Sequence, residues 1–255
     1  MIRINDGTEK FKSEMISLCA DSPFGARILS YVTAYDNKYS FIDSWLCTDE
    51  DNKSVCAVCR YYDTVMICGH INNETAMFIS ALSPKELIFD GESDLPIDMT
   101  WSHGMLMKCE NPKKIIDKDK CIVTALDGSI KELRNVYYLM SDGFGFDAKI
   151  GFEDFAVDMS HRIRHKTAAV YVVYMDNKIV SSLIVPAITP KCAMISGVVT
   201  RSEYRRQGIG SFLVSYVTSR IISQGKTVYL QTEKKISIYD KIGFTVCKGW
   251  KSGRM

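Results

Sequence analysis

The sequence lacks several features that would assign it to a special class of protein. No apolar run approaches the ~18 residues of a membrane-spanning helix, and the longest, such as Ala168 to Met175, have the length of a strand. The N-terminal Met1 to Gly7 has no apolar region like that of a signal peptide. The 255 residues carry a formal charge of only +2, which argues against nucleic acid as the main partner. We therefore expect a cytoplasmic protein with one large or two small domains.

A disulfide framework is also missing. Nine cysteines, an odd number, are scattered without regular spacing, which indicates reduced thiols in the core. One group has the composition of a zinc site, because Cys56 and Cys59 are followed by Cys68 and His70. Zinc takes a C-x-x-C pair from a turn, whereas Cys56 to Tyr61 has the pattern of a strand, in which residues three apart point to opposite faces. We therefore predict core thiols and no metal.

A basic loop with two glycines organises the C-terminal third of the chain. Met194 to Val199 has the pattern of an apolar strand, and the polar segment Thr200 to Ser211 follows it and leads into a helical pattern. Glycines let backbone N–H groups approach a ligand closely, and the first turn of a helix leaves its amides unpaired. The sequence therefore predicts an anion site here, with a pyrophosphate as its natural occupant.

The loop differs from two common phosphate-binding motifs. No Gly-Lys-Ser/Thr closes it as in a Walker loop, and Leu213 stands where the dinucleotide motif G-x-G-x-x-G has glycine. The helical pattern continues to Ile221, Gly225 is placed to end the helix, and Thr227 to Thr232 has the composition of a strand. Between Arg201 and Met255 there are eleven Lys and Arg but three Asp and Glu, a surplus that suits a ligand with several phosphates.

Two motifs occur together in this region. The first is the loop Arg205-Arg206-Gln207-Gly208-Ile209-Gly210, and the second is the short helical segment Ile238-Tyr239-Asp240-Lys241-Ile242-Gly243-Phe244. Their order and separation resemble the GNAT superfamily of N-acetyltransferases, whose acetyl-CoA loop has the form Arg/Gln-x-x-Gly-x-Gly/Ala. The resemblance covers about residues 165–247 and implies the α+β GNAT fold, a twisted, mixed and mostly antiparallel sheet flanked by helices. One position departs from the family, which often has Asn where this chain has Thr232.

The resemblance implies acetyl-CoA as a co-substrate and assigns roles to the residues of both motifs. The main chain of the strand would hold the pantetheine arm and the thioester carbonyl, and the loop amides would hold the pyrophosphate. Tyr239 matches the family's tyrosine near the sulfur and would protonate the departing thiolate, although a core tyrosine between Ile238 and Ile242 is the alternative. The cofactor-binding residues implied are Val198, Val199, Thr200, Arg205, Arg206, Gln207, Gly208, Ile209, Gly210, Ser211 and Thr232.

The sequence does not single out one residue as the general base. A base needs a pKa near neutrality, which suits histidine. His161 and His165 lie one helical turn apart in a segment that lines the acceptor side in this family. The alternatives are a pair of surface histidines with a structural role, or a water relay with no single base.

The first half of the chain repeats the order of elements of the second half. We expect helices over residues 9–20, 24–35 and 73–82 and strands over 41–48, 54–61, 64–68 and 86–89. The third of these strands ends in Gly69-His70-Ile71-Asn72-Asn73, with no basic G-x-G loop. We therefore predict two domains, 1–128 and 129–255, of which the first is a degenerate GNAT-like copy that does not bind cofactor.

The remaining elements connect and complete the second copy. Asp176-Asn177 is a turn pair between two apolar strands, which predicts a hairpin. Ser141 to Phe146 is expected to be an aromatic loop, either a connector or a lid over the substrate. The other expected elements are strands over 100–110 and 120–125, a helix over 130–140, an amphipathic helix around 152–163, and a last strand over 244–247.

The leading hypothesis is an acetyl-CoA-dependent N-acetyltransferase that acts on a primary amine of a small or amino-acid-like acceptor, by direct attack of the amine on the thioester. Two alternatives remain open. The acceptor is a peptide or protein amine, or the chain is a non-catalytic acyl-CoA-binding or interaction module. A homodimer is possible, and neither nucleic acid nor a membrane is an expected partner.

Overall fold

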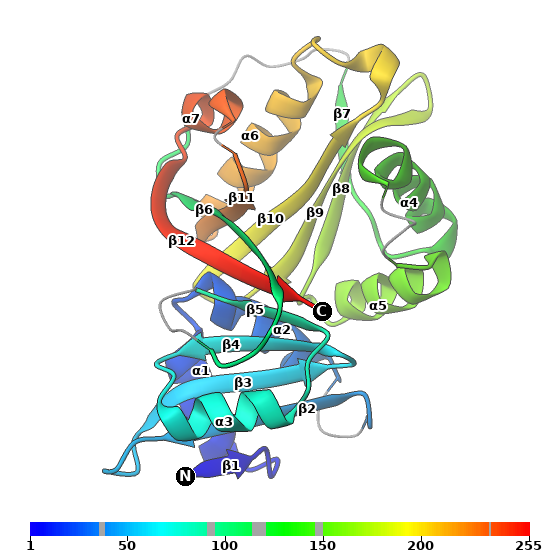
Figure 1. Ribbon diagram of the computed structural model, residues 1–255. Coiled ribbons are helices and arrows are strands. Elements are labelled where there is room, and N and C mark those ends of the chain that lie inside the picture. Colours follow the sequence, from blue (N-terminus) through cyan, green and yellow to red (C-terminus); the bar gives the residue numbers. More distant parts are fainter. Residues whose placement is uncertain (36–38, 91–94, 114–120, 146–149, 235) are drawn as a thin grey trace.

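The computed structural model describes residues 1–35, 39–90, 95–113, 121–145, 150–234 and 236–255, and within them twelve strands form one sheet flanked by helices (Figure 1). The elements of the first half are β1 (Ile2–Ile4), α1 (Glu9–Cys19), α2 (Pro23–Tyr35), β2 (Ile42–Thr48), β3 (Ser54–Tyr61), β4 (Thr64–Gly69), α3 (Asn73–Ala81), β5 (Glu86–Phe89) and β6 (Thr100–Cys109). Those of the second half are β7 (Ile122–Ala125), α4 (Ile130–Phe144), α5 (Phe152–Arg164), β8 (Ala169–Met175), β9 (Lys178–Ile188), β10 (Cys192–Thr200), α6 (Ile209–Ile222), β11 (Thr227–Thr232), α7 (Ser237–Ile242) and β12 (Thr245–Arg254).

The strand order is symmetric about its middle. It runs β1-β2-β3-β4-β5-β12-β6-β11-β10-β9-β8-β7, so each strand of the first six has its counterpart six strands later. The directions agree as well, because β4–β5 and β10–β11 are the parallel pairs and the other neighbours are antiparallel. Helices fall in matching places: α1 and α2 correspond to α4 and α5, and α3 to α6. The mixed, mostly antiparallel sheet and the repeat that the sequence predicts are confirmed.

The sixth strand of each half crosses into the other half. β12 pairs with β5, β6 pairs with β11, and the two pair with each other from Thr245–Lys108 to Arg254–Thr100. Figure 1 shows β12 and β6 crossing between the strands of the two halves. The two halves therefore share one continuous sheet. Their division into domains at about residue 128 stays a proposal, with β6 lying among strands of the second half.

Local sequence explains several elements directly. Asp176 and Asn177 have φ of 48° and 60°, the left-handed conformation that a two-residue hairpin turn requires, which confirms the predicted hairpin of β8 and β9. The loop expected from Ser141 is wrong as far as Phe144, because α4 continues through that residue and ends at Gly145 with φ of 61°. The rest of that expected loop, Phe146, lies outside the described residues. β12 is also longer than the strand expected over 244–247, and β1 was not predicted.

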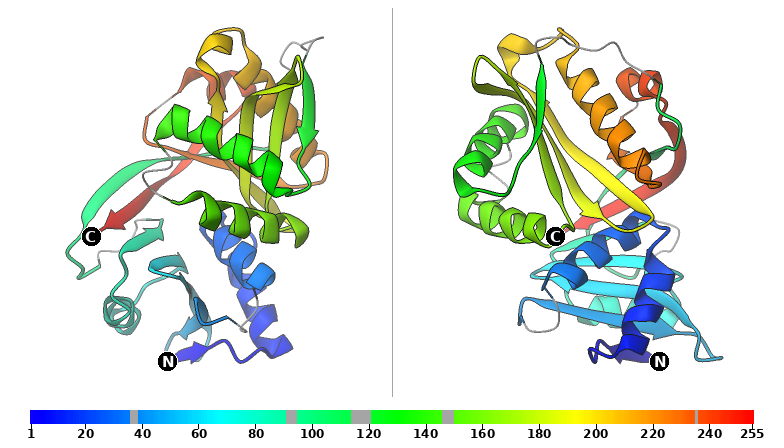
Figure 2. Two further views of the ribbon diagram at one scale, coloured as in Figure 1. Left: turned by 90° about the vertical axis from the view of Figure 1, so that its right-hand side faces the viewer. Right: turned by 180° about the vertical axis from the view of Figure 1, so that it is seen from behind.

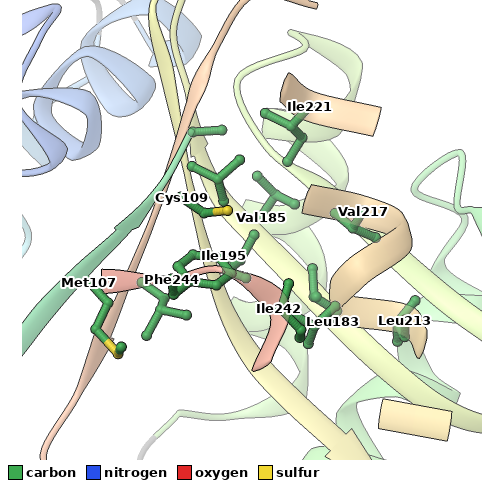
Figure 3. Packing of buried hydrophobic residues seen from close by; sticks show 14 of the residues in the cluster. Met107, Cys109, Leu183, Val185, Ile195, Leu213, Val217, Ile221, Ile242 and Phe244 are labelled. Atoms are coloured by element: carbon green, nitrogen blue, oxygen red, sulfur yellow. The ribbon is translucent and has the colours of Figure 1, made fainter. Parts of the chain in front are cut away.

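The core lies on both faces of the sheet. α6 packs on one face of the second half, against a cluster that includes Met107, Leu213 and Phe244 (Figure 3). The next residue along β6, Leu106, points to the opposite face and joins the cluster beneath α1 and α2. The views in Figure 2 show α4 and α5 on the other side of the second half's strands from α6. Adjacent residues of a central strand thus fill separate cores.

Cysteines also divide between these cores. Cys56 lies in the cluster beneath α3, whereas Cys59 and Cys68 lie in the cluster beneath α1 and α2. The C-x-x-C pair therefore points to opposite faces of β3, as a strand requires. Within the described ranges, no group of three or more His, Cys, Asp or Glu is arranged to hold a metal ion. None of the helices in those ranges is long and apolar enough to cross a membrane.

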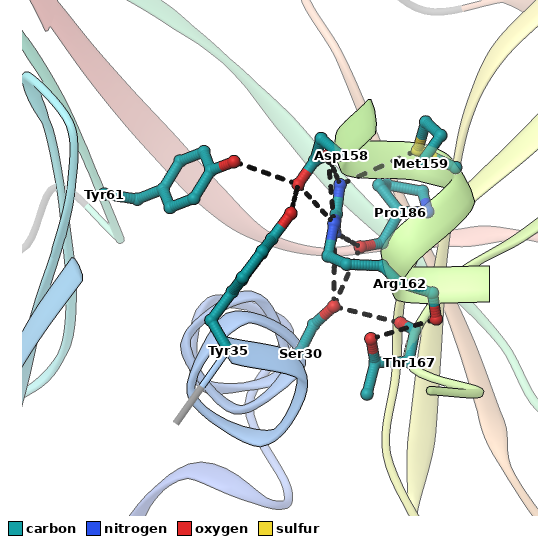
Figure 4. A network of polar contacts seen from close by, with 8 residues as sticks. All are labelled: Ser30, Tyr35, Tyr61, Asp158, Met159, Arg162, Thr167 and Pro186. Atoms are coloured by element: carbon teal, nitrogen blue, oxygen red, sulfur yellow. Dashed lines mark hydrogen bonds and ion pairs between the residues drawn. The ribbon is translucent and has the colours of Figure 1, made fainter. Parts of the chain in front are cut away.

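A buried polar network joins the two halves (Figure 4). Arg162 of α5, 3% exposed, donates to both carboxylate oxygens of Asp158 at 2.6–3.0 Å and to Ser30 Oγ of α2 at 3.2 Å. The hydroxyls of Tyr35 and Tyr61 donate to the same carboxylate at 2.7 and 3.1 Å. Burial raises the pKa of both tyrosines, so each keeps the proton that it donates. This network fixes α2 against α5.

Candidate functional site

The predicted anion loop connects the end of β10 to the start of α6. A single 3₁₀ turn, Ser202–Tyr204, follows the strand, and Arg206 and Gly208 then take positive φ of 60° and 78°. Gly208 is the N-cap of α6, and as glycine it adopts this left-handed conformation without steric cost. The side chains of Arg205, Arg206 and Gln207 are all exposed. The backbone therefore turns sharply and leaves two arginines at the mouth of the helix.

The N-terminus of α6 is open. The backbone amides from Gln207 to Ser211 donate to no described group, and Gly208 has no side chain that caps the helix. Unpaired amides and the helix dipole together concentrate positive potential at such an end. With Arg205 and Arg206 beside it, the site has the chemistry of a phosphate-binding loop.

The loop is fastened to the strands below it. Arg205 Nε donates to Thr200 O at 2.9 Å, and Arg201 Nε donates to Ile179 O at 2.8 Å. Ser181 Oγ lies 2.7 Å from Val199 O, to which it donates, and 2.9 Å from Thr200 Oγ1. These bonds hold the loop in place before any ligand binds.

β10 and β11 stop pairing before either strand ends. Their parallel ladder joins Cys192–Ile195 to Thr227–Leu230, while β10 runs on to Thr200 and β11 to Thr232. The irregularity lies in β10, where Gly197 takes φ of 56° and the register with β9 shifts on both sides of Ser196. Ser196 is exposed although it lies within a central strand. The sheet therefore opens next to Val198 and Val199, at the foot of the anion loop.

Tyr239 packs beside this opening. It lies on α7, half-buried, and packs on the same cluster beneath α6 as Val198 and Tyr204. Ile242, fully buried, anchors α7 in the core, so Tyr239 is not needed for that purpose. The Tyr239 hydroxyl makes no hydrogen bond to a described residue. Burial raises its pKa, so the hydroxyl keeps its proton at neutral pH and can donate it.

Thr232, at the position where the family often has Asn, is buried at the end of β11. Its hydroxyl donates to Lys234 O at 2.6 Å. The side chain therefore closes the turn after β11.

His161 and His165 lie at a different place. His161 Nε2 is 2.7 Å from Ala34 O, its ring stacks on Tyr35 at 4.5 Å, and His165 Nδ1 is 2.9 Å from His161 O. The segment after them, at Thr167, pairs with Ile188 at one end of β9, whereas the anion loop attaches at the other end, about 30 Å away along the strand. The structure brings the loop, the opening and Tyr239 together, and it does not bring these histidines to them.

Sequence reasoning missed three residues near the opening. Arg27 of α2 donates to the side-chain oxygen of Gln231, the first residue of β11 beyond the parallel ladder, and Trp250 of β12 lies nearby. One signal was available: Arg27 is the only charged residue in Pro23–Tyr35. A lone charge in an apolar helix needs a polar environment, but only the structure shows where α2 packs.

Comparison with known proteins agrees with this geometry. Residues 166–246 match the model of the acetyltransferase (GNAT) domain. A Drosophila protein has a similar structure with a TM-score of 0.68 at 8% identity, covering 100% of this chain and 98% of that one. A tandem GNAT protein from the clavulanic acid biosynthesis pathway has a TM-score of 0.58 at 11% identity, covering 99% and 98% of the two chains.

A putative acetyltransferase of the GNAT family from Novosphingobium aromaticivorans also has a TM-score of 0.58, at 13% identity, covering 92% of this chain and 96% of that one. No curated protein sequence matches the chain. The matches confirm the resemblance to the GNAT superfamily of N-acetyltransferases, and the tandem neighbour spans both halves of this chain.

Proposed function

We propose that the protein is an acetyl-CoA-dependent N-acetyltransferase that modifies a primary amine of a small molecule. The observation that carries this proposal is the run of unpaired amides from Gln207 to Ser211 at the start of α6, directly beyond the point where β10 and β11 separate. An open helix end suits a pyrophosphate, and an open strand pair next to it suits an extended, hydrogen-bonding arm.

The residues present fit acetyl-CoA, which supplies an activated acetyl thioester when bound. The loop amides would hold its pyrophosphate, with Arg205 and Arg206 adding charge. Gly210 leaves room for this contact, because a Cβ on that residue would lie 3.2 Å from Thr200 Oγ1 and would fill the space at the helix end. The main chain of Val198 to Thr200 would hold the pantetheine arm, since no ladder joins it to β11.

The reaction requires one bond to form and one to break. The neutral amine forms a bond to the acetyl carbon, the carbon–sulfur bond breaks, and the sulfur leaves with the electron pair. Tyr239 holds a proton beside the opening and would deliver it to that sulfur. The proton lost from the amine passes to solvent, because His161 is held against Ala34 of α2 and His165 against His161, both away from the loop.

Two features favour a small acceptor and a catalytic role. α2 packs on β9 and β10 on the face opposite α6, at the cluster of Ala26, Ala187 and Met194, and so limits the room for a peptide. Tyr239 has a hydroxyl that no described residue engages, which a purely acyl-CoA-binding module does not require. The cytoplasmic location and a possible homodimer stay predictions.

Thiol release from acetyl-CoA against a panel of amines, amino acids and peptides tests the proposal. We expect release with a small amine and a fall in kcat of about 100-fold in Tyr239→Phe, the usual size of a lost proton donor, with acetyl-CoA affinity unchanged. Tyr216→Phe, an exposed tyrosine on α6, is the control and should behave as wild type. Tight binding without acceptor-dependent release would instead indicate a binding module, and release with peptides alone would indicate a protein acetyltransferase.

A further inference from the structure

Arg27 is a partly buried cation that forms no ion pair with a described residue. Its guanidinium donates to the neutral side chain of Gln231, and no carboxylate in the described ranges forms an ion pair with it. Its Nε is buried and finds no hydrogen-bond partner in the part of the chain that the structure describes. Burial of a charge is unfavourable unless the charge is paired, and a guanidinium cannot relieve this by losing its proton. Glu86 stabilises the charge of Arg27 only from beyond ion-pair distance, so the guanidinium can still take an anionic partner in direct contact.

A second unsatisfied donor lies close by. Trp250 Nε1 is buried and has no hydrogen-bond partner among the described residues. A Cβ on Gly104 would lie 2.5 Å from both Trp250 Nε1 and Thr232 O, so the indole N–H lies beside the end of β11. Gly104 leaves the space that the indole occupies. Two buried N–H groups, one from helix α2 and one from strand β12, thus flank the last residues of β11.

Both donors lie on one face of the sheet, along the end of β11 that extends past its ladder with β10. Gln231 is opposite Leu106 and Trp250 is opposite Gly104, so these residues share the face that α2 covers. Ser196, the residue of β10 after the last pair with β11, is exposed at this irregularity of the strand. Tyr239 lies on the other face, beneath α6. A molecule at Arg27 would therefore meet the opening from the side opposite Tyr239.

We propose that Arg27 and Trp250 bind a carboxylate of the acceptor, so that the acceptor is an amino acid or another small amine that carries a carboxylate. This inference rests on the proposed function and specifies the substrate class of the same site. A guanidinium presents donors in a planar fork that matches a carboxylate, and Gln231 holds the guanidinium in position. The indole N–H adds one neutral donor to the same group. Arg27 is thereby a specificity-determining residue contributed by the first half of the chain to the site of the second.

Calorimetric titration of the full chain, saturated with CoA, with each of the common amino acids and with its carboxamide tests this directly. We expect the amino acid to bind on the order of 10- to 100-fold more tightly than its carboxamide, as a hydrogen-bonded charge pair implies. Arg27→Met should abolish the difference, and Arg27→Lys should restore part of it. Arg220→Met, an exposed arginine at the end of α6, is the matched control and should keep the difference.

Trp250→Phe separates the two donors. The indole N–H can donate to a carboxylate or to an amide oxygen, so this substitution should weaken both ligands about equally, by several-fold. A purely structural role for Arg27 would lower the melting temperature without changing the ratio of the two affinities. Equal affinity of acid and carboxamide in the wild type, an unchanged ratio in Arg27→Met, or no binding of any amino acid would overturn the proposal. Failure of the proposed function appears separately, as absence of thiol release with every amine.

Discussion

The two halves of the chain build the same scaffold and end its central helix differently. In the first half, only His70 to Asn72 connect β4 to α3, and the Asn72 side chain accepts a hydrogen bond from Thr75 N at 2.8 Å. In the second half, a longer basic loop precedes α6, and Gly208 leaves the helix end uncapped. The Asn72 side chain thus caps one amide of α3, whereas no described side chain caps the start of α6. We therefore expect cofactor binding to depend on the loop before α6 and not on the fold that both halves share.

The halves also depend on each other. α2, which covers the first half's sheet, also contacts β9 and β10, and it carries Arg27 to the end of β11. The first half has no basic G-x-G loop, yet its helix α2 covers part of the second half's sheet.

The largest effect is expected from disrupting the buried network in which Asp158 of α5 accepts hydrogen bonds from Tyr35 and Tyr61 of the first half. Asp158→Asn leaves Arg162, which is 3% exposed, without its carboxylate, and such a change costs about 3–5 kcal/mol of unfolding free energy. Urea denaturation measures this difference. Asp154→Asn, an exposed acid on the same helix, is the control and should have a much smaller effect. Equal stability of the two variants would show that the network does not hold α2 to α5.

A charge at the second residue of each central helix tests the comparison of the helix ends. That residue is Gly210 in α6 and already an acid, Glu74, in α3. Gly210→Asp places a carboxylate at the anion site and should weaken acetyl-CoA binding by about 100-fold, whereas an acid in the first turn stabilises the helix itself. Glu74→Gln should leave the affinity unchanged. Calorimetry would contradict the assignment if both variants bound acetyl-CoA like the wild type.

The pH profile tests the assignment of Tyr239. Its active form is protonated, and burial raises its pKa above the usual value of about 10, so the proton donor is retained throughout the neutral and mildly alkaline range. The rate should therefore rise from about pH 7 to 9 as the acceptor amine loses its proton, without an alkaline fall below about pH 10. A fall centred near pH 8 that Tyr239→Phe removes would show that the tyrosine has the opposite shift.

The smallest effect is expected at the histidines. His161→Asn should change kcat by no more than about threefold, because His161 contacts Ala34 and Tyr35 of α2 and lies at the far end of β9 from the loop. Steady-state kinetics with the best acceptor measure this. A loss of 100-fold or more with unchanged stability would restore His161 as the general base.

Local features of the fold could be predicted from the sequence. The β8–β9 turn is set by Asp176 and Asn177, and the start of α6 is set by Gly208. The exchange of β6 and β12 could not be predicted, since it depends on pairs such as Lys251 with Phe89 that lie far apart in the chain. The expected loop from Ser141 failed for a related reason. Gly143 lies inside α4, where it permits close packing of the helix on β10. A Cβ at this position would lie 2.4 Å from Val199 Cγ2.

The candidate site divides in the same way. The anion loop and Tyr239 follow from short motifs, so their residues could be named in advance. Arg27 and Trp250 come from α2 and β12, whose positions depend on the packing of the whole sheet. A single charged residue in an apolar helix was the one visible sign of that part of the site.

Hydrogen exchange of the backbone amides with and without acetyl-CoA tests most directly whether the second half alone carries the cofactor site. We predict that acetyl-CoA slows exchange of the amides from Gln207 to Ser211, which are unpaired in the structure, and leaves those of His70 to Thr75 unchanged. Protection in the turn before α3, or none in the loop before α6, would contradict the assignment.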